Sequence, residues 1–229
     1  ADIVTDSSPF APLACDALHR FVPTDRPGEL ISRCVFGLVI FGDGIVLILN
    51  DDLGEAPCDV FHTGVIEITG IPVGTVIILT GLALLALWIP LREQPGLGTI
   101  LNAVEIGLVV DLVLPWVPEP DQLAVRFAMM LVGVIMIGIG SGFYIGAGLG
   151  PGPRDGLMTG LSRRGLFGRN VSIRVARTGI EVIVLSIGVL LGGSIGIGTA
   201  VFACGIGPLV QVFLPRLTIR RLSPASAEV

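Results

Sequence analysis

The stretch from Leu149 to Gly160 reads LGPGPRDGLMTG, and it joins helix-breaking glycines and prolines to an adjacent arginine and aspartate. A similar stretch, LGEAPCDVFHTG, runs from Leu53 to Gly64 and shares leucine, glycine, proline, aspartate and threonine at the same spacing. Residues 96–115 match residues 196–215 in the same way. Because both matches occur in the same order along the chain, the sequence predicts a duplication in which each half contains one broken segment.

The rest of the chain is apolar. Of its 229 residues, 52% are hydrophobic and 14% are charged, and the mean hydropathy is +0.87. Soluble domains carry about 25% charged residues, so these values predict an integral membrane protein. About 20 apolar residues cross a bilayer as a helix. Apolar runs of that kind predict six spans, at roughly residues 31–49, 72–91, 97–115, 127–147, 178–191 and 195–214.

The distribution of charge predicts that the two halves are inverted relative to one another. Residues 51–72 contain five acidic residues and no basic one, whereas the equivalent residues 151–177 contain six arginines. Arginine-rich connections stay in the cytoplasm, so the two equivalent connections face opposite sides. The expected fold is an all-α membrane protein with six transmembrane helices. They form two inverted three-helix repeats, each with a short broken or re-entrant amphipathic helix.

The same charges predict where the chain lies. All fourteen basic residues are arginine, which we interpret as the coding bias of a GC-rich bacterial genome. We expect a multi-pass protein of the bacterial plasma membrane with both termini in the cytoplasm. A short interfacial helix is expected near residues 11–21, without the apolar core of a signal peptide. The expected organisation is an N-terminal tail at 1–29, a first repeat at 30–118, a second repeat at 119–216 and a C-terminal tail at 217–229.

The sequence lacks the motifs of an enzyme. The four cysteines are scattered, the two histidines are too few for a histidine-based zinc site, and no Ser-His-Asp or Cys-His arrangement has catalytic spacing. The glycine-rich strings follow no strand and are not followed by the lysine of a phosphate-binding loop. We therefore expect no enzymatic activity, no catalytic residue, no metal, no cofactor and no nucleic-acid partner.

The broken segments are the predicted substrate site. Pro57 and Pro153 suit the first turn of a helix, which places Asp59 and Asp155 where a carboxylate can cap free N–H groups. The alternative to simple capping is a pair of half-helices whose N-termini attract an anionic group while the aspartates bind a cation or proton. Candidate substrate-binding residues are Pro57, Asp59, His62, Thr63, Pro153, Arg154, Asp155 and Thr159.

The segments at 55–69 and 151–165 are expected to be amphipathic. Either they lie flat in the membrane interface, or they re-enter the membrane and are buried against protein. We expect His62 to be exposed on the polar face, with proton transfer as the alternative role, and Arg154 to pair locally or to contact a ligand. The apolar face would hold Phe61, Val65 and Ile68, and the polar face Asp59, His62, Thr63 and Glu67.

Two acidic residues lie near the middle of predicted spans. Asp43 and Glu105 fall near the middle of the first and third spans. A charge there costs at least roughly 2.5–3.5 kcal/mol on insertion scales, so both are candidates for proton or ion coupling. The alternative is a wet vestibule or pairing with an arginine. Arg177 and Glu181 are four residues apart, which predicts an ion pair on one helix face, serving as a structural contact or a cytoplasmic gate.

Several segments resemble the YczE/YyaS/YitT family of bacterial integral membrane proteins. They are LGEAPCDVFHTGV, PGLGTILNAVEIGLVVDLVL, GFYIGAGLGPGPRDGLMTGLSRR, SIRVARTGIEV and GIGTAVFACGIGPLVQ, and the resemblance covers about residues 20–216. It implies a plasma-membrane protein, sometimes proposed as a transporter, without an assigned substrate. The positions that match the family's motifs are Pro57, Asp59, His62, Pro153, Arg154, Asp155, Arg177 and Glu181.

Inverted repeats with broken helices are typical of secondary transporters, whose sites lie at the repeat interface. The leading hypothesis is therefore a permease for a small polar metabolite, working by alternating access between the halves. One alternative is an accessory membrane protein that organises a membrane enzyme or sensor through the arginine-rich loop 163–177, where a protein partner or a second copy would bind. Another is a lipid-handling protein. A transporter requires the broken segments to meet at a cavity, whereas an accessory protein would leave the bundle centre closed.

Overall fold

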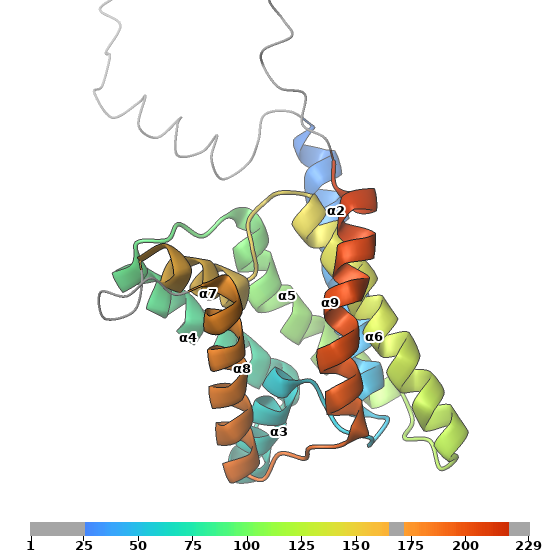
Figure 1. Cartoon of the computed structure of the whole chain (residues 1–229). Coiled ribbons are helices and arrows are strands. Elements are labelled where there is room, and N and C mark those ends of the chain that lie inside the picture. Colours follow the sequence, from blue (N-terminus) through green and yellow to red (C-terminus); the bar gives the residue numbers. More distant parts are fainter. Residues whose placement is uncertain (1–25, 165–171, 220–229) are drawn as a thin grey trace, which may run out of the picture.

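The computed structural model describes residues 26–164 and 172–219, apart from the side chains of Arg164, Ile173 and Arg174. Over these residues the chain is helical, without a strand (Figure 1). Several helices are long and apolar enough to cross a membrane, which confirms the expectation of an all-α membrane protein. They are α2 (Pro27–Leu49), α4 (Val73–Leu91), α5 (Leu97–Val113, extended by the 3-10 turn η1, Leu114–Trp116), α6 (Leu123–Gly146) and α9 (Ile197–Leu217).

The predicted span at residues 178–191 corresponds to α8 (Ile173–Leu190), which differs in composition. It has 18 residues and includes Arg174, Arg177 and Glu181, so it is more polar than the five helices above. The span at 178–191, and with it the total of six spans, therefore stays a prediction, as do the inverted orientation and the domain boundaries. The helix expected near residues 11–21 and most of both tails lie outside the described residues.

The two broken segments form short helices that begin at the predicted prolines. α3 (Pro57–Thr69) and α7 (Pro153–Arg164) each start after a turn through a glycine with positive φ. These are Gly54, with φ of 111°, and Gly150, with φ of 128°. Glycine adopts this region without steric cost, and proline suits the first helical turn. The local sequence therefore fixes where each short helix begins.

The two halves of the chain are interlocked. The backbone N–H of Gly98 donates to the carbonyl of Leu149 at 3.0 Å, and the N–H of Gly198 donates to the carbonyl of Leu53 at 2.8 Å. Each broken segment thus crosses the segment that precedes the last long helix of the other half. As a result α3 packs on α8 and α7 packs on α4, so each short helix rests on the opposite half (Figure 1).

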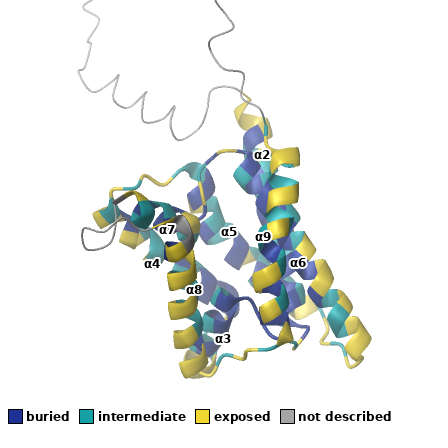
Figure 2. Ribbon diagram, viewed as in Figure 1, coloured by how far each residue is buried: buried dark blue, intermediate teal, exposed yellow. Residues whose placement is uncertain are grey.

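The core forms where α2 and α6 cross. Gly37 and Gly44 of α2 approach Gly140 and Gly133 of α6 so closely that a Cβ on any of them would meet backbone atoms of the other helix. Close backbone approach through small residues is a common means of packing membrane helices. Buried residues concentrate along this contact and toward α5, while the outward faces are exposed (Figure 2).

The equivalent helix pairs of the two halves pack differently. α4 lies against α5 because the backbones of Gly74 and Gly107 touch and Gly81 faces Ala103. α8 and α9 make no comparable contact (Figure 1). Aligning the two halves with the shift of 100 residues that relates 96–115 to 196–215 places Arg174 and Glu181 where α4 has its two glycines. These larger residues do not allow the same close packing.

We predict that Gly107→Val destabilises the protein more than Gly207→Val does. A side chain at Gly107 would collide with the backbone of Gly74, but a Cβ at Gly207 has no atom within 4 Å. Overpacking costs about 1–3 kcal/mol. Thermal unfolding of the purified protein in detergent should show this loss for Gly107→Val alone. The two positions are repeat equivalents inside helices, and valine at 207 also carries the strain of preceding Pro208, so a loss at Gly107→Val that does not exceed that of Gly207→Val would contradict the asymmetric packing.

Candidate functional site

A cavity of about 550 Å³ lies where the first turns of α3 and α7 meet. α3 contributes Cys58, Asp59 and His62 to its lining, and α7 contributes Arg154 and Asp155. The long helices complete the walls mainly with apolar side chains. Interior cavities of this size are in the range that small-molecule sites occupy, about 300–1,000 Å³. The two broken segments therefore meet at a cavity inside the bundle.

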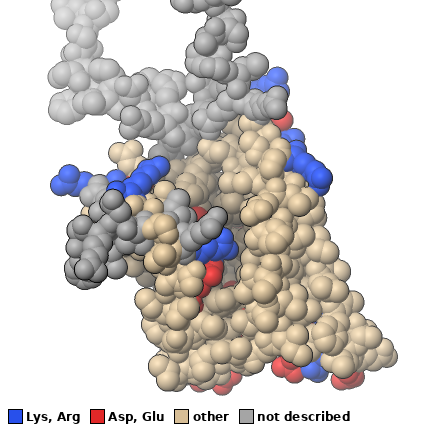
Figure 3. All heavy atoms as spheres, in the orientation of Figure 1, with Lys and Arg blue, Asp and Glu red and all other residues tan. Residues whose placement is uncertain are grey.

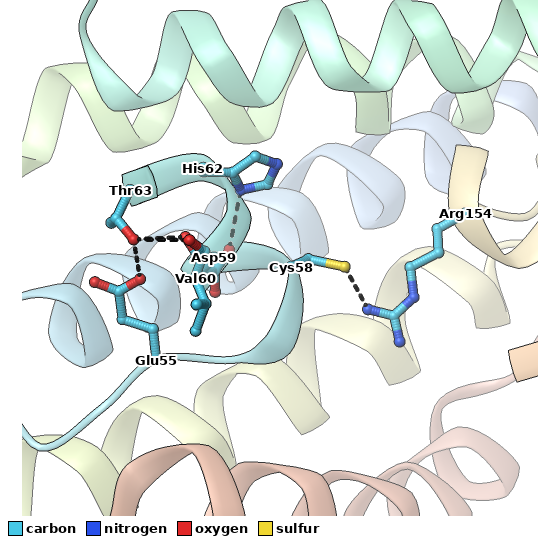
Figure 4. Close-up of polar contacts among 7 residues, drawn as sticks. All are labelled: Glu55, Cys58, Asp59, Val60, His62, Thr63 and Arg154. Carbon is cyan, nitrogen blue, oxygen red and sulfur yellow. Dashed lines mark hydrogen bonds and ion pairs between the residues drawn. The ribbon is translucent and has the colours of Figure 1, made fainter. Parts of the chain in front are cut away.

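Arg154 connects the two short helices to α8. Its Nη1 donates to Sγ of Cys58 at 3.0 Å, across the boundary between the halves (Figure 4). Its Nη2 donates to Oε1 of Glu181, which also accepts from Nε of Arg177 at 3.1 Å. The predicted pair of Arg177 and Glu181 is thus present, and Arg154 joins it as a third member. The Nε of Arg154 is buried and has no hydrogen-bond partner in the part of the chain that the structure describes.

The thiol of Cys58 is the weakest partner in this arrangement. Burial raises the pKa of Cys58, while the neighbouring Arg154 charge lowers it. A neutral thiol is only a weak hydrogen-bond acceptor. Arg154 therefore keeps donor capacity beside the cavity, in addition to its strong contact with Glu181.

The two repeat-related aspartates have different surroundings. Asp155 is exposed and lines the cavity, where it accepts a hydrogen bond from the hydroxyl of Tyr144 at 3.1 Å. Asp59 is 5% exposed, and its Oδ1 lies 3.3 Å from Nδ1 of His62. The residue that caps α3, Ala56, makes no side-chain capping bond. Both aspartates thus contact other side chains at the site.

The predicted orientation of α3 was wrong. We expected His62 to be exposed, but only 7% of its surface is accessible, whereas Ile68 on the expected apolar face is 66% exposed. The reason is that α3 packs on α8 and lines the cavity, so Asp59 and His62 face protein and contact each other, while Glu67 at the end of the helix stays exposed. Figure 4 shows His62 and Asp59 side by side on α3.

The remaining predicted substrate residues lie at the margin of the site. Pro153 lines the cavity, but Pro57, Thr63 and Thr159 do not. The hydroxyl of Thr159 donates to the carbonyl of Asp155 at 2.9 Å, within its own helix. The hydroxyl of Thr63 donates to Oε2 of Glu55 at 2.8 Å, as Figure 4 shows. Both threonines lie outside the cavity lining. Their hydrogen bonds hold the side chains of Thr159 and Thr63 against neighbouring residues of the same segment.

Two buried acids escaped the sequence analysis. Glu55 is 9% exposed, and burial raises its pKa to about 7 despite the hydrogen bond from Thr63. Asp51 is fully buried, and burial raises its pKa to about 6 while the N–H of Leu53 opposes the shift. Both lie in a connection that reads as a solvated acidic loop. The one available signal was their proximity in sequence to the broken segment.

The two acids inside the spans do not reach the cavity. Neither Asp43 nor Glu105 belongs to its lining. Glu105 lies within electrostatic range of Cys34 on α2, and its Oε2 is buried without a hydrogen-bond partner among the described residues. The structure therefore does not connect the predicted coupling residues to the site of the two short helices.

Comparisons with known proteins agree with the resemblance. The family described as "Family of unknown function (DUF6198)" matches residues 30–215. An uncharacterized protein of Haemophilus influenzae is 38% identical over 81% of this chain and 84% of its own length. Of two Bacillus subtilis relatives, the uncharacterized membrane protein YczE is 34% identical over 82% of this chain and 88% of its own length. The uncharacterized protein YyaS is 28% identical over 78% and 89%. No solved structure matches the chain.

We predict that Arg154→Gln lowers the free energy of unfolding by about 1–3 kcal/mol, because it removes a charged hydrogen bond that ties α7 to α8. The matched control is Arg163→Gln on the same helix. Arg163 is 69% exposed and pairs with Glu93 at the surface, where an ion pair contributes about 0–1 kcal/mol. Chemical or thermal unfolding in detergent measures both losses. Similar losses for the two variants would contradict a structural role for the Arg154 contact.

We predict that the protein becomes less stable as the pH rises from about 4.5 to about 7. The pKa of Glu55 in the folded chain, about 7, lies above its usual value, so the folded chain holds a proton that the unfolded chain releases in this window. Glu55→Gln should flatten the dependence, and melting temperatures across the window measure it. Glu67→Gln is the matched control, since Glu67 is exposed on α3, the helix that follows Glu55. A Glu55→Gln profile as steep as that of the wild type would refute the assignment.

Proposed function

This chain belongs to the DUF6198 family of membrane proteins that includes YczE and YyaS, and from that premise we propose that it is a secondary transporter for a small polar metabolite. The observation that carries the proposal is the cavity shared by Asp59 and Asp155. Secondary transporters bind their substrates between repeats, at the ends of broken helices. A chain that only organised a partner would need no cavity at this place.

Interlocked, duplicated halves support alternating access between inverted repeats. Each short helix rests on the other half, so a movement of one half carries the opposite side of the cavity with it. Charge supports the inverted orientation. Figure 3 shows basic atoms gathered near the end where α2 begins and acidic atoms near the opposite end. Because basic connections stay in the cytoplasm, the end where α2 begins would be the cytoplasmic end.

We assign the polar side chains at the cavity separate roles. Arg154 lines it at the start of α7 and would contact the polar group of the solute, while Asp155 lines it as the acceptor of the Tyr144 hydroxyl. The pair of Asp59 and His62 is better placed to carry a proton than the acids inside the spans, because it lines the cavity. Glu181 and Arg177 would serve as a cytoplasmic gate.

The other candidate roles have less support. The accessory-protein hypothesis rests on the loop 163–177, of which residues 165–171 lie outside the described part of the chain. A protein partner or a second copy at that loop remains an alternative to the solute as the main partner. We propose no enzymatic activity and no cofactor, and we place the protein in the bacterial plasma membrane with both termini in the cytoplasm.

We predict that a transported metabolite raises the melting temperature of the wild type but not of Asp59→Asn or Asp155→Asn. A ligand at about 100 times its Kd adds about 2.7 kcal/mol of stability, which a melting scan across a metabolite panel detects. Asp121→Asn, which removes an exposed aspartate far from the cavity lining, is the matched control and should keep the shift. Uptake of the responding metabolite into liposomes then tests transport. Silence of all four folded proteins across a broad panel would favour the accessory role.

A further inference from the structure

We propose that the cavity opens sideways into the bilayer between α8 and α9, and that its solute is a single-chain amphipath with a carboxylate head. The solute would reach the site from the membrane. This proposal rests on the proposed function, because it names the class of solute and its route. It narrows the polar metabolite to a molecule that has both a polar head and an apolar body.

The opening is formed by two helices that do not pack on each other. Ile180, Val184 and Ile187 of α8 line the cavity on one side, and Gly207 and Val210 of α9 line it on the other. No close packing joins α8 to α9 in the described chain. Figure 3 shows the surface hollowed between these helices, with acidic and basic atoms inside an otherwise uncharged face. The cavity therefore meets the lipid-facing side of the bundle.

Residue size explains why this side is open. In the first half, a Cβ at Gly81 would lie 3.1 Å from the Cβ of Ala103, so a larger residue there would push α4 away from α5. The equivalent residue of α8 is Glu181, whose side chain points to Arg154 and Arg177 instead. Gly207 consequently faces open space, although its counterpart Gly107 touches the backbone of Gly74. The opening follows from the sequence of α8.

The walls of the cavity suit an apolar body. They are formed largely by aliphatic and aromatic side chains, including Phe41, Ile45, Leu84, Ile137 and Phe202. A fully polar solute would leave its hydrogen-bonding groups unpaired against such walls, which is unfavourable. An alkyl chain that enters from the lipid instead moves from one apolar environment to another. Entry from the bilayer therefore requires no desolvation of polar groups along the apolar part of the solute.

The polar end of the cavity suits a carboxylate. Arg154 and Arg177 both donate to Glu181, Asp155 adds a second negative charge close to Arg154, and the Nε–H of Arg154 is buried without an acceptor among the described residues. Guanidinium groups bind carboxylates through two parallel hydrogen bonds. Asp155 lies on the same turn as Arg154, but it accepts from the hydroxyl of Tyr144 and offers the head no donor. The head would therefore bind at Arg154, with the chain directed toward α8 and α9.

The test uses the full-length protein in lipid nanodiscs with a palmitic acid that carries a diazirine on its chain. After illumination, mass spectrometry identifies the labelled peptides. We expect labels on the cavity-facing residues of α8 and α9 in the wild type. Gly207→Trp fills the opening from a position without neighbours within 4 Å, and it should lower labelling by about tenfold or more, in line with the scale that relates affinity to free energy.

Two matched variants separate filling of the opening from a general effect of substitution. Gly207→Ala adds only one methyl group at the same position and should keep the labelling. Gly179→Trp places the same bulk on an exposed part of α8 outside the cavity lining and should also keep it. The head group is tested without a mutation, because the corresponding diazirine alcohol lacks the charge and should label the site several-fold less than the acid.

Each possible labelling or flux result either supports or overturns the proposed sideways opening. Equal labelling of the wild type and Gly207→Trp shows lipid that merely surrounds the protein, and it overturns the proposal. No labelling of the wild type, as expected if residues 1–25 or a second copy cover the opening, overturns it as well. Specific labelling without flux of the acid in liposomes would support the site and refute the transporter. Flux of a water-soluble solute that Gly207→Trp leaves unchanged would support the transporter and refute the sideways route.

Discussion

The crossing of two glycine-containing connections is the constraint on which the remainder of the structure depends. The N–H groups of Gly98 and Gly198 each bond to a carbonyl of the opposite half, of Leu149 and Leu53 respectively. Glycines at the crossing are required because a Cβ there would meet the backbone of the other connection. With the connections locked together, the prolines that follow start both short helices at the centre of the bundle. The meeting point of the halves is therefore fixed before any functional side chain is considered.

Within this repeated frame, the site is made by differences between equivalent residues. Cys58 and Arg154 occupy the same position in the two halves, and the thiol accepts a hydrogen bond from the guanidinium. At a second contact the large and the small residue change places between the halves. Trp88 packs over Gly156 of α7, whereas its counterpart Gly188 packs against Val60 of α3. Each exchange preserves the packing of a short helix on the opposite half. A symmetric fold thereby acquires an asymmetric cavity, which can hold a solute with distinct ends.

Part of this structure could be predicted from the sequence. The duplication, the long helices and the starts at Pro57 and Pro153 follow from composition and local conformational preference, and all depend on short stretches of chain. The orientation of α3 did not follow, because an amphipathic pattern identifies a polar face but not what that face meets. We expected His62 to be exposed to solvent, whereas it is buried and lines the cavity. Glu55 was missed for the same reason, since burial of an acid depends on neighbours distant in sequence.

The separation of α8 from α9 was not predicted from the sequence, and it can be traced to individual residues only because the structure shows that α8 begins 100 residues after α4. Glycine in α4 becomes Glu181 in α8, and that one replacement has two linked effects. It removes one of the two glycine contacts that join α4 to α5 in the first half, and it provides the carboxylate that holds Arg154 and Arg177. Closure of α8 on α9 with the geometry of α4 and α5 would bring that side chain against the opposite helix. Under the proposed alternating access, α8 would therefore move together with α7, to which Arg154 ties it.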